Sequence, residues 1–181
     1  MKGTRLVLFV VILTMMAMLA VGCKPTNQDN ADVNKNPAPA AVTKEVTLYF
    51  SDKQAEFLVA EKRTIQVAVD ELQQVAKAVV NELIAGPRDT SLSKTIPPEA
   101  RLLSVNIQDK TAVVDFSTEL QTKHWGGSAG ETMTIMSIVN SLTELPGIEK
   151  VQFLIEGQKQ ESLVGHWDLT NPIPRDQKII K

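Results

Sequence analysis

The chain has 181 residues, of which 43% are hydrophobic and 22% are charged. Lys2 and Arg5 are the only charged residues among the first 22, so 17 of the 19 basic side chains and all 21 acidic ones lie in residues 23–181, a net charge of −4. This negative balance argues against a surface that binds nucleic acid or anionic lipid. The single cysteine, Cys23, excludes a disulfide within the chain.

Residues 1–22 have the features of an export signal. Lys2 and Arg5 provide a positive start, and the only polar side chain from Leu6 to Gly22 is that of Thr14. This apolar run is shorter than a comfortable membrane span, and small residues precede a cleavage point. We therefore expect residues 1–22 to be a signal peptide that takes no part in the fold.

Ala20-Val21-Gly22 precedes Cys23 and resembles the bacterial lipobox, in which the signal is cut just before a cysteine that carries lipid. Ala20 departs from the Leu that is most frequent at its position, but it is a tolerated variant. The alternative is an ordinary secreted protein with a lone thiol, which would leave this cysteine without an explanation. Two acyl chains, such as palmitate, anchor a protein stably, so we expect lipid attachment at Cys23 on the extracytoplasmic face of the cell membrane.

Residues 23–44 are rich in Asn, Asp, Pro, Ala and Lys and have no periodic apolar pattern. Such a segment buries too little apolar surface to offset its loss of entropy on ordering, so we expect a flexible tether. At roughly 3 Å per extended residue, it would hold a domain several tens of ångströms from the membrane. Residues 45–181 have the common size of one domain, and no internal repeat is visible.

The domain is predicted to begin with a hairpin and a helix. Apolar and polar side chains alternate from Val46 to Phe50, and a second extended run, Phe57–Ile65, follows a polar turn. From Leu72 to Ile84, apolar residues recur at i, i+3, i+4, i+7, i+8, i+11 and i+12, which predicts an amphipathic helix. Asp70 is the expected N-cap, and Gly86-Pro87 ends the helix.

A second hairpin is predicted at the centre of the domain. Leu103, Val105 and Ile107 fall on one face of an extended chain, and Asp109-Lys110 separates them from the β-branched run Thr111–Phe116. One face of this hairpin is apolar and needs a cover. Leu83 and Ile84 of the helix before it are expected to supply part of that cover.

A second helix is predicted from about Gly130 to Leu145, with its methionines as core filler. Val151–Ile155 is continuously apolar, which is typical of a central strand. The order strand, strand, helix, strand, strand, helix, strand predicts an α+β fold. We expect a two-layer sandwich with a small mixed sheet and two helices on one of its faces.

Several short motifs occur in order along the domain, and together they resemble those of a known family. The motifs are Val46-Thr47-Leu48-Tyr49-Phe50, Leu58-Val59 before Arg63, Glu82-Leu83-Ile84-Ala85-Gly86-Pro87, Ile96-Pro97, Val113-Val114-Asp115-Phe116-Ser117, Ser141-Leu142-Thr143-Glu144-Leu145 with Pro146-Gly147, and Val151 to Gly157. In this order and at these distances they resemble the GerMN domain of sporulation and spore germination, named from the GerM lipoprotein.

This resemblance implies a role in assembly. GerMN domains are similar to the ring-building motifs of sporulation and secretion channels, which share the inner order helix, hairpin, helix, strand. GerM looks like a tandem of two such domains, whereas this chain has room for one. The partners implied are envelope or sporulation proteins, with self-association as a further expectation.

The sequence offers no group of residues typical of catalysis. It contains no nucleophile motif or phosphate loop, and its two histidines, His124 and His166, lie far apart without a second ligand at i+3 or i+4. A zinc site needs three or four convergent ligands, so we expect neither a metal nor a cofactor. Asp115 interrupts an apolar strand and is expected to face solvent or to cap the turn at Ser117-Thr118.

Trp125 and Trp167 are the candidate interaction residues, because each follows a histidine and tryptophan is an effective interface anchor. The alternative is that the indoles cap the ends of the core. Trp125 stands in a glycine-rich loop, which favours an interaction role for it more than for Trp167.

Two functions therefore remain open for a non-enzymatic domain of this kind. The first is a lipoprotein that assembles with or supports an envelope complex in sporulation or germination. The second is a module that binds the glycan of the peptidoglycan wall. A small hydrolase is disfavoured because the sequence lacks a catalytic constellation.

Replacement of Cys23 by Ala tests the predicted anchor. We expect the variant to leave the membrane fraction or to accumulate as uncut precursor, because the acylated residue is gone. Cell fractionation and the mass of the mature protein provide the measurement. A Cys23→Ala protein that is processed normally and stays with the membrane would refute the prediction.

Overall fold

The computed structural model describes residues 41–181, so the predicted signal peptide, Cys23 and most of the predicted tether lie outside the described residues. The elements in chain order are β1 (Val42–Ser51), β2 (Leu58–Val67), α2 (Leu72–Ala85), β3 (Leu102–Gln108), β4 (Thr111–Phe116), α3 (Glu119–Thr122), α4 (Gly127–Leu142), β5 (Lys150–Ile155), β6 (Gln158–Lys159) and β7 (Ile173–Pro174). All seven predicted elements are present in the predicted order, and the α+β class is confirmed.

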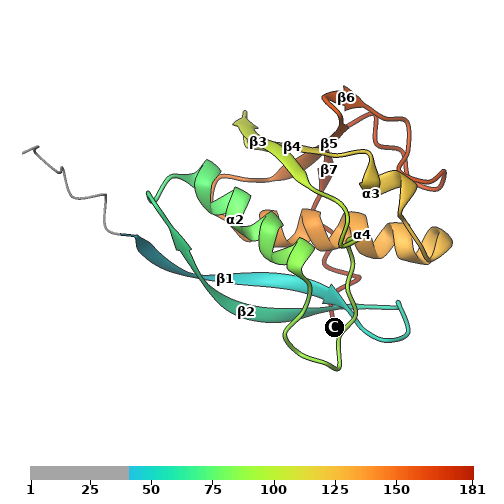
Figure 1. Cartoon of the computed structure of the whole chain (residues 1–181), viewed down its shortest axis with the longest axis horizontal. Coiled ribbons are helices and arrows are strands. Elements are labelled where there is room, and N and C mark those ends of the chain that lie inside the picture. Colours follow the sequence, from blue (N-terminus) through green and yellow to red (C-terminus); the bar gives the residue numbers. More distant parts are fainter. Residues whose placement is uncertain (1–40) are drawn as a thin grey trace, which may run out of the picture. The chain divides into compact units, whose positions relative to one another are not determined.

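The two long helices lie between two sheets (Figure 1). The antiparallel ribbon β1–β2 packs on one side of α2 and α4, and the larger sheet packs on the other. The expected mixed sheet with two helices on one face is therefore present, and the ribbon adds a layer of its own. Because α4 is covered on both sides, nearly its whole circumference is buried.

The larger sheet is mixed, with β5 as its central strand. β3 and β4 form the predicted antiparallel hairpin, whose turn residues Asp109 and Lys110 both have positive φ, as a two-residue hairpin turn requires. β4 then pairs in parallel with β5, and α4 makes the crossover between them. The short strands β6 and β7 pair antiparallel with β5.

The expectation that Leu103 shares the buried face of the hairpin is wrong. Leu102 pairs with Phe116 and Ser104 pairs with Asp115, so Leu103 is an extra residue in β3. This bulge turns its side chain outward, and 45% of Leu103 is exposed while Val105 is fully buried.

Both helices begin at a different residue from the one predicted. Glu71, and not the predicted Asp70, is the N-cap of α2, and it makes no side-chain cap bond. The Asp70 carboxylate instead forms an ion pair with Lys44 at 2.5 Å. α4 begins at Gly127, three residues before the predicted start, and Gly126 at φ 89° turns the chain into it. Within residues 41–181, no helix is both long enough and apolar enough to cross a membrane.

Two serines of α4 cover the outer edge of β1. The backbone N–H of Tyr49 donates to Ser141 Oγ at 2.9 Å, and Ser137 Oγ donates to the Tyr49 carbonyl at 2.7 Å. An open strand edge is a template for pairing with another chain, and a helix laid along it satisfies the free backbone groups. These fully buried serines therefore join α4 to the ribbon.

Truncation of Leu83 tests the packing of α2. Leu83 is fully buried in the core, so Leu83→Ala should cost about 2–5 kcal/mol of the free energy of unfolding, measured by urea denaturation. Ile84→Ala is the matched control and should cost less, because Ile84 is only partly buried. A loss below about 1 kcal/mol for Leu83→Ala would mean that α2 does not present this face to the core.

Candidate functional site

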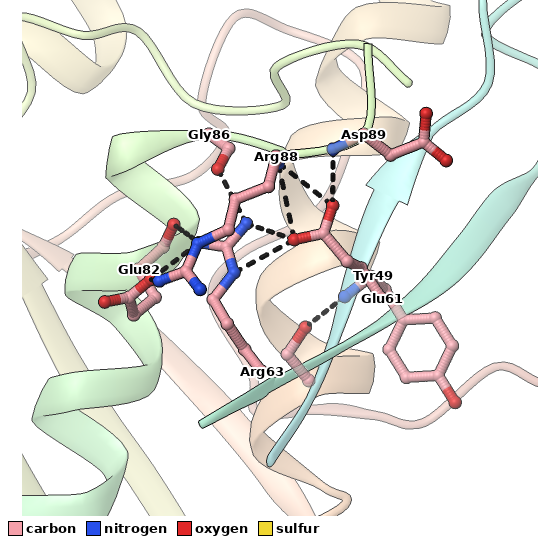
Figure 2. Close-up of polar contacts among 8 residues, drawn as sticks. Tyr49, Glu61, Arg63, Glu82, Gly86, Arg88 and Asp89 are labelled. Atoms are coloured by element: carbon pink, nitrogen blue, oxygen red, sulfur yellow. Dashed lines mark hydrogen bonds and ion pairs between the residues drawn. The ribbon is translucent and has the colours of Figure 1, made fainter. Parts of the chain in front are cut away.

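A buried arginine lies where β2 meets the end of α2 (Figure 2). The Arg63 guanidinium donates to the Glu61 carboxylate, to the Glu82 carboxylate at 2.6 Å and to the Glu82 and Gly86 carbonyls at 3.2 and 2.9 Å. Its carbon Cζ lies 5.3 Å from the centre of the Phe50 ring, within cation–π range. Only 1% of the Arg63 side chain is exposed, so a partner for each of its N–H groups is a requirement of burial.

The same cluster holds the loop that follows α2. Glu61 Oε2 accepts the backbone N–H groups of Arg88 and Asp89 at 3.0 and 3.1 Å. Burial raises the pKa of the Glu61 carboxyl, but the hydrogen bonds from Arg63 and from this backbone outweigh it, so the pKa lies below its ordinary value. We call Glu61, Arg63 and Glu82 the Arg63 cluster. This cluster connects β2, α2 and the loop after α2.

A buried carboxylate performs a similar task on α4. Glu131 is fully buried, and its Oε1 accepts the backbone N–H groups of Leu163 and Val164 at 3.0 Å each. Its Oε2 accepts the backbone N–H of His166 at 2.9 Å. Glu131 therefore holds the loop before β7 against α4, and the exposed His166 side chain has no part in that contact.

Arg175 holds the C-terminal segment in the same way. It donates to the Tyr49 hydroxyl at 2.9 Å and to the Asn140 carbonyl at 2.8 Å, and it pairs with Glu144. The Tyr49 hydroxyl in turn donates to Glu144 at 2.7 Å. Burial, and then the Glu144 carboxylate, raise the pKa of Tyr49.

Asp115 supports a neighbouring turn, although it does not cap Ser117-Thr118 as one prediction had it. Its Oδ1 accepts the backbone N–H of Gly157 at 2.9 Å, while Glu156 Oε1 accepts the N–H of Thr118. Among residues 41–181, no three His, Cys, Asp or Glu side chains converge as metal ligands.

The hollow that best combines an aromatic with polar groups lies beside Trp125. A cleft of about 210 Å³ is bounded by the β1–β2 loop, by the segment 93–95 and by the first turn of α4. Trp125 lies at its rim with 46% of its surface exposed. Asp52, Lys53 and Lys94 are also among the residues that line it. This cleft, which we call the Trp125 cleft, is the candidate binding site.

Glycine and histidine fix the loop that presents Trp125. A Cβ atom on Gly130 would lie 2.3 Å from the Trp125 carbonyl oxygen, so only glycine fits beneath this turn. The His124 ring stacks beside the indole at 6.1 Å, and its Nε2 lies 3.0 Å from Thr134 Oγ1. Burial lowers the pKa of His124, although the nearby Glu131 carboxylate opposes this.

Trp167 occupies a different environment. Its Nε1–H donates to Thr132 Oγ1 on α4 at 2.9 Å, and the partly buried ring packs against the core. This geometry favours the core-capping interpretation of Trp167. Trp125 and Trp167 lie on different parts of the fold, and only Trp125 lines the cleft.

The comparisons with known proteins agree with this fold. The sequence profile of the Germane family, described as "Sporulation and spore germination", matches residues 47–161, which is more than half of the chain. No curated protein matches the chain. The expected GerMN resemblance is thus confirmed.

Three solved structures are similar to this one. A protein of Clostridium perfringens described as a candidate lipoprotein shares 27% identity over 73% of this chain and 87% of that one, with a TM-score of 0.54. The tandem GerMN domains of the sporulation protein GerM from Bacillus subtilis give 24% identity, 84% and 51% coverage and a TM-score of 0.59. The first GerMN domain of GerM shares 22% identity over 73% of this chain and 98% of that one, with a TM-score of 0.57. The chain thus spans about half of the tandem structure, and at these identities the GerM structures show the fold alone.

Replacement of Arg63 by Met tests the structural role of the Arg63 cluster. The change leaves two carboxylates without their buried partner, so we expect a loss of about 3–5 kcal/mol in the free energy of unfolding. Arg88→Met is the matched control, because Arg88 meets Glu82 at 3.5 Å on the surface, and it should change stability by less than about 1 kcal/mol. Equal effects of the two changes would contradict the assignment.

The wild type and Arg63→Met should also differ in how their free energy of unfolding changes at acidic pH. The folded-state pKa of Glu61 is depressed, so its contribution is present above the unfolded value near 4.5 and is lost as the pH falls through the folded value. Wild-type stability should therefore fall more steeply below about pH 4.5 than that of Arg63→Met.

Proposed function

Because the chain belongs to the Germane family of sporulation and spore germination, we propose that it is a lipid-anchored extracytoplasmic protein that supports an envelope complex in one of these processes. In this proposal the domain acts by binding partners through its surface and catalyses no reaction. Cys23 carries the lipid, and the segment before β1 is the tether.

The observation that carries the proposal is the use of the buried charges. Arg63 and Glu131 are the fully or nearly fully buried charged residues of the described chain, and both bind elements of the fold to one another. Neither lies beside a nucleophile or an open donor pair, as an acid or base in catalysis would. These buried charges thus hold elements of the fold together, which suits a protein that acts by presenting surfaces to partners.

Two further observations support the proposed lipid anchor. The sequence places a lone cysteine directly after a signal with small residues at its end. The similar Clostridium perfringens protein is described as a candidate lipoprotein, at 27% identity.

The surface that fits a protein partner best is the edge strand β3. It pairs with β4 on one side only in the described part of the chain, and its bulge exposes Leu103. An edge strand with an exposed apolar side chain can pair with another chain by strand addition. We therefore assign the contact with the complex to β3.

Charge substitutions on β3 test this proposal. Leu103→Glu and Asn106→Glu place carboxylates on exposed positions of the edge strand, so we expect sporulation or germination to fail while circular dichroism shows a folded domain. Asn171→Glu is the matched control on an exposed loop position and should be silent.

Single alanine substitutions at His124, Asp115 and His166 test the alternative that the domain has a catalytic or small-ligand site. These changes should leave function nearly intact, because the proposal assigns no chemistry to them. If one of them abolished function in a stable protein while the β3 changes were silent, an enzyme or a small-ligand site would replace the assembly role.

A further inference from the structure

The outer edge of β1 is covered over its C-terminal part. The backbone N–H and C=O of Tyr49 bind two serines of α4, and the Ser51 carbonyl accepts the N–H of Ser93 at 2.8 Å. Tyr49 and Ser51 are two residues apart, and in an antiparallel ribbon the backbone groups of every second residue point to the same edge. The odd-numbered residues of β1 thus turn their N–H and C=O groups away from β2.

The N-terminal part of the same edge is open. By this alternation Thr43, Glu45 and Thr47 turn their backbone groups outward, and within residues 41–181 none of these groups has a hydrogen-bond partner. Their N–H and C=O groups alternate along about 14 Å of strand. A row of donors and acceptors at this spacing matches the backbone of an extended polypeptide, which is how a strand is added to a sheet.

A groove of about 420 Å³ follows the open edge. All residues from Thr43 to Thr47 line it, so it runs along the edge of the strand, because one face of a strand would contribute only every second residue. Its other lining residues are Val75 of α2 and the segment Glu144–Pro146 after α4. A second hollow shares Val75 and extends the groove to Leu72 at the start of α2.

The charged residues that line the groove already have partners. Lys44 pairs with Asp70, Glu45 with Lys62 and Glu144 with Arg175. A charged side chain of a ligand would therefore find no free counter-ion in the groove, whereas Val75 and Leu145 offer an apolar floor to an aliphatic one. The groove thus fits an occupant that is uncharged and aliphatic on the side that enters it.

We propose that the open half of β1 and its groove bind an extended segment of a partner protein, which adds to the ribbon as a third strand. The segment pairs its backbone with Thr43, Glu45 and Thr47, and its alternate side chains, aliphatic and uncharged, enter the groove above Val75 and Leu145. Pairing along this edge selects a polypeptide over a glycan or a lipid, because neither of these has donors and acceptors that alternate at strand spacing. This surface is separate from β3, and the inference does not rest on the partner assigned to β3.

Two other extended segments are alternatives for this edge. One is the stretch directly before β1, residues 23–40. Its only aliphatic side chain larger than alanine, apart from proline, is Val33, and Pro37 and Pro39 lack the N–H donor that a strand needs. This composition fits the groove less well than a segment with an aliphatic residue at every second position. The other alternative is a strand of a second copy of the chain, which the experiment distinguishes by concentration.

Amide exchange, followed by NMR on the full-length protein in detergent micelles, tests whether the edge is open. In the protein alone, the amides of Thr43, Glu45 and Thr47 should exchange rapidly, whereas those of Lys44 and Val46 are protected by β2. Protection of the three outward amides at every protein concentration would mean that the segment before β1 covers the edge. Protection that grows with protein concentration would mean that a second copy does. Either result would overturn the inference.

The probe for the partner segment is a capped hexapeptide of alternating threonine and valine with a solubilising tail of two lysines. We expect saturable binding at millimolar peptide, together with slower exchange of the three outward amides. The controls are a peptide of the same composition with its valines in one block, and a peptide of alternating threonine and aspartate. Both should bind about tenfold more weakly or less, because neither places an aliphatic side chain at every second position.

Substitutions in β1 assign the binding to its edge. Glu45→Pro removes an outward N–H and no bond to β2, so it should weaken the alternating peptide about tenfold or more. Glu45→Ala is the matched control, because it also loses the ion pair with Lys62 but keeps the N–H, and it should bind as the wild type does. Leu103→Glu on β3 should bind normally as well.

N-methylation of the peptide repeats this test without altering the protein. Methyl groups on one set of alternate residues should abolish binding, because their N–H groups face β1, and methyl groups on the other set should leave it intact. Three results would overturn the inference: no saturable binding of the alternating peptide, equal binding of the block peptide, or unchanged affinity in Glu45→Pro. None of them bears on the effect of the β3 variants in cells, so failure here is distinguishable from failure of the proposed function.

Discussion

The fold depends on one buried cation. Arg63 lies in the β1–β2 ribbon, and its guanidinium reaches the end of α2 and the carbonyl of Gly86. A charge buried to this extent is costly unless every donor is paired, so the ribbon, the helix end and the loop can adopt only arrangements that satisfy it together. The pairing adds less to stability than to specificity of arrangement, because its Coulomb energy is offset by desolvation.

Buried polar side chains of the helix α4 hold other parts of the domain in a similar way. It lies between two sheets, and its buried polar residues bind a strand edge, a loop and the C-terminal segment through Ser141, Glu131 and Asn140. Each bond joins groups that are far apart in sequence. The result is a domain whose loops are fixed from beneath, so that their outer side chains are free to meet partners or ligands.

Periodicity predicted the elements of this fold because each depends on local burial. Leu72 to Ile84 and the central hairpin follow the helical and strand periods, and the structure contains both. Leu103 and Asp70 were misassigned since a bulge and an ion pair with Lys44 override local preference. The sequence marked Arg63 only as part of a family motif and did not mark Glu131, because their partners other than Glu61 lie 19 to 35 residues away. His124-Trp125 with its glycines did mark the cleft loop, but the other walls come from distant segments.

Native-state hydrogen exchange of the Arg88 and Asp89 amides tests the role of Arg63 most directly. Both N–H groups donate to Glu61, which Arg63 holds. If the cluster is the constraint that orders this region, these loop amides should exchange only when α2 opens, with an opening free energy within about 1 kcal/mol of that of Val80. Exchange of the two amides at near-zero opening free energy while Val80 stays protected would show that the cluster does not hold the loop, and it would contradict the account.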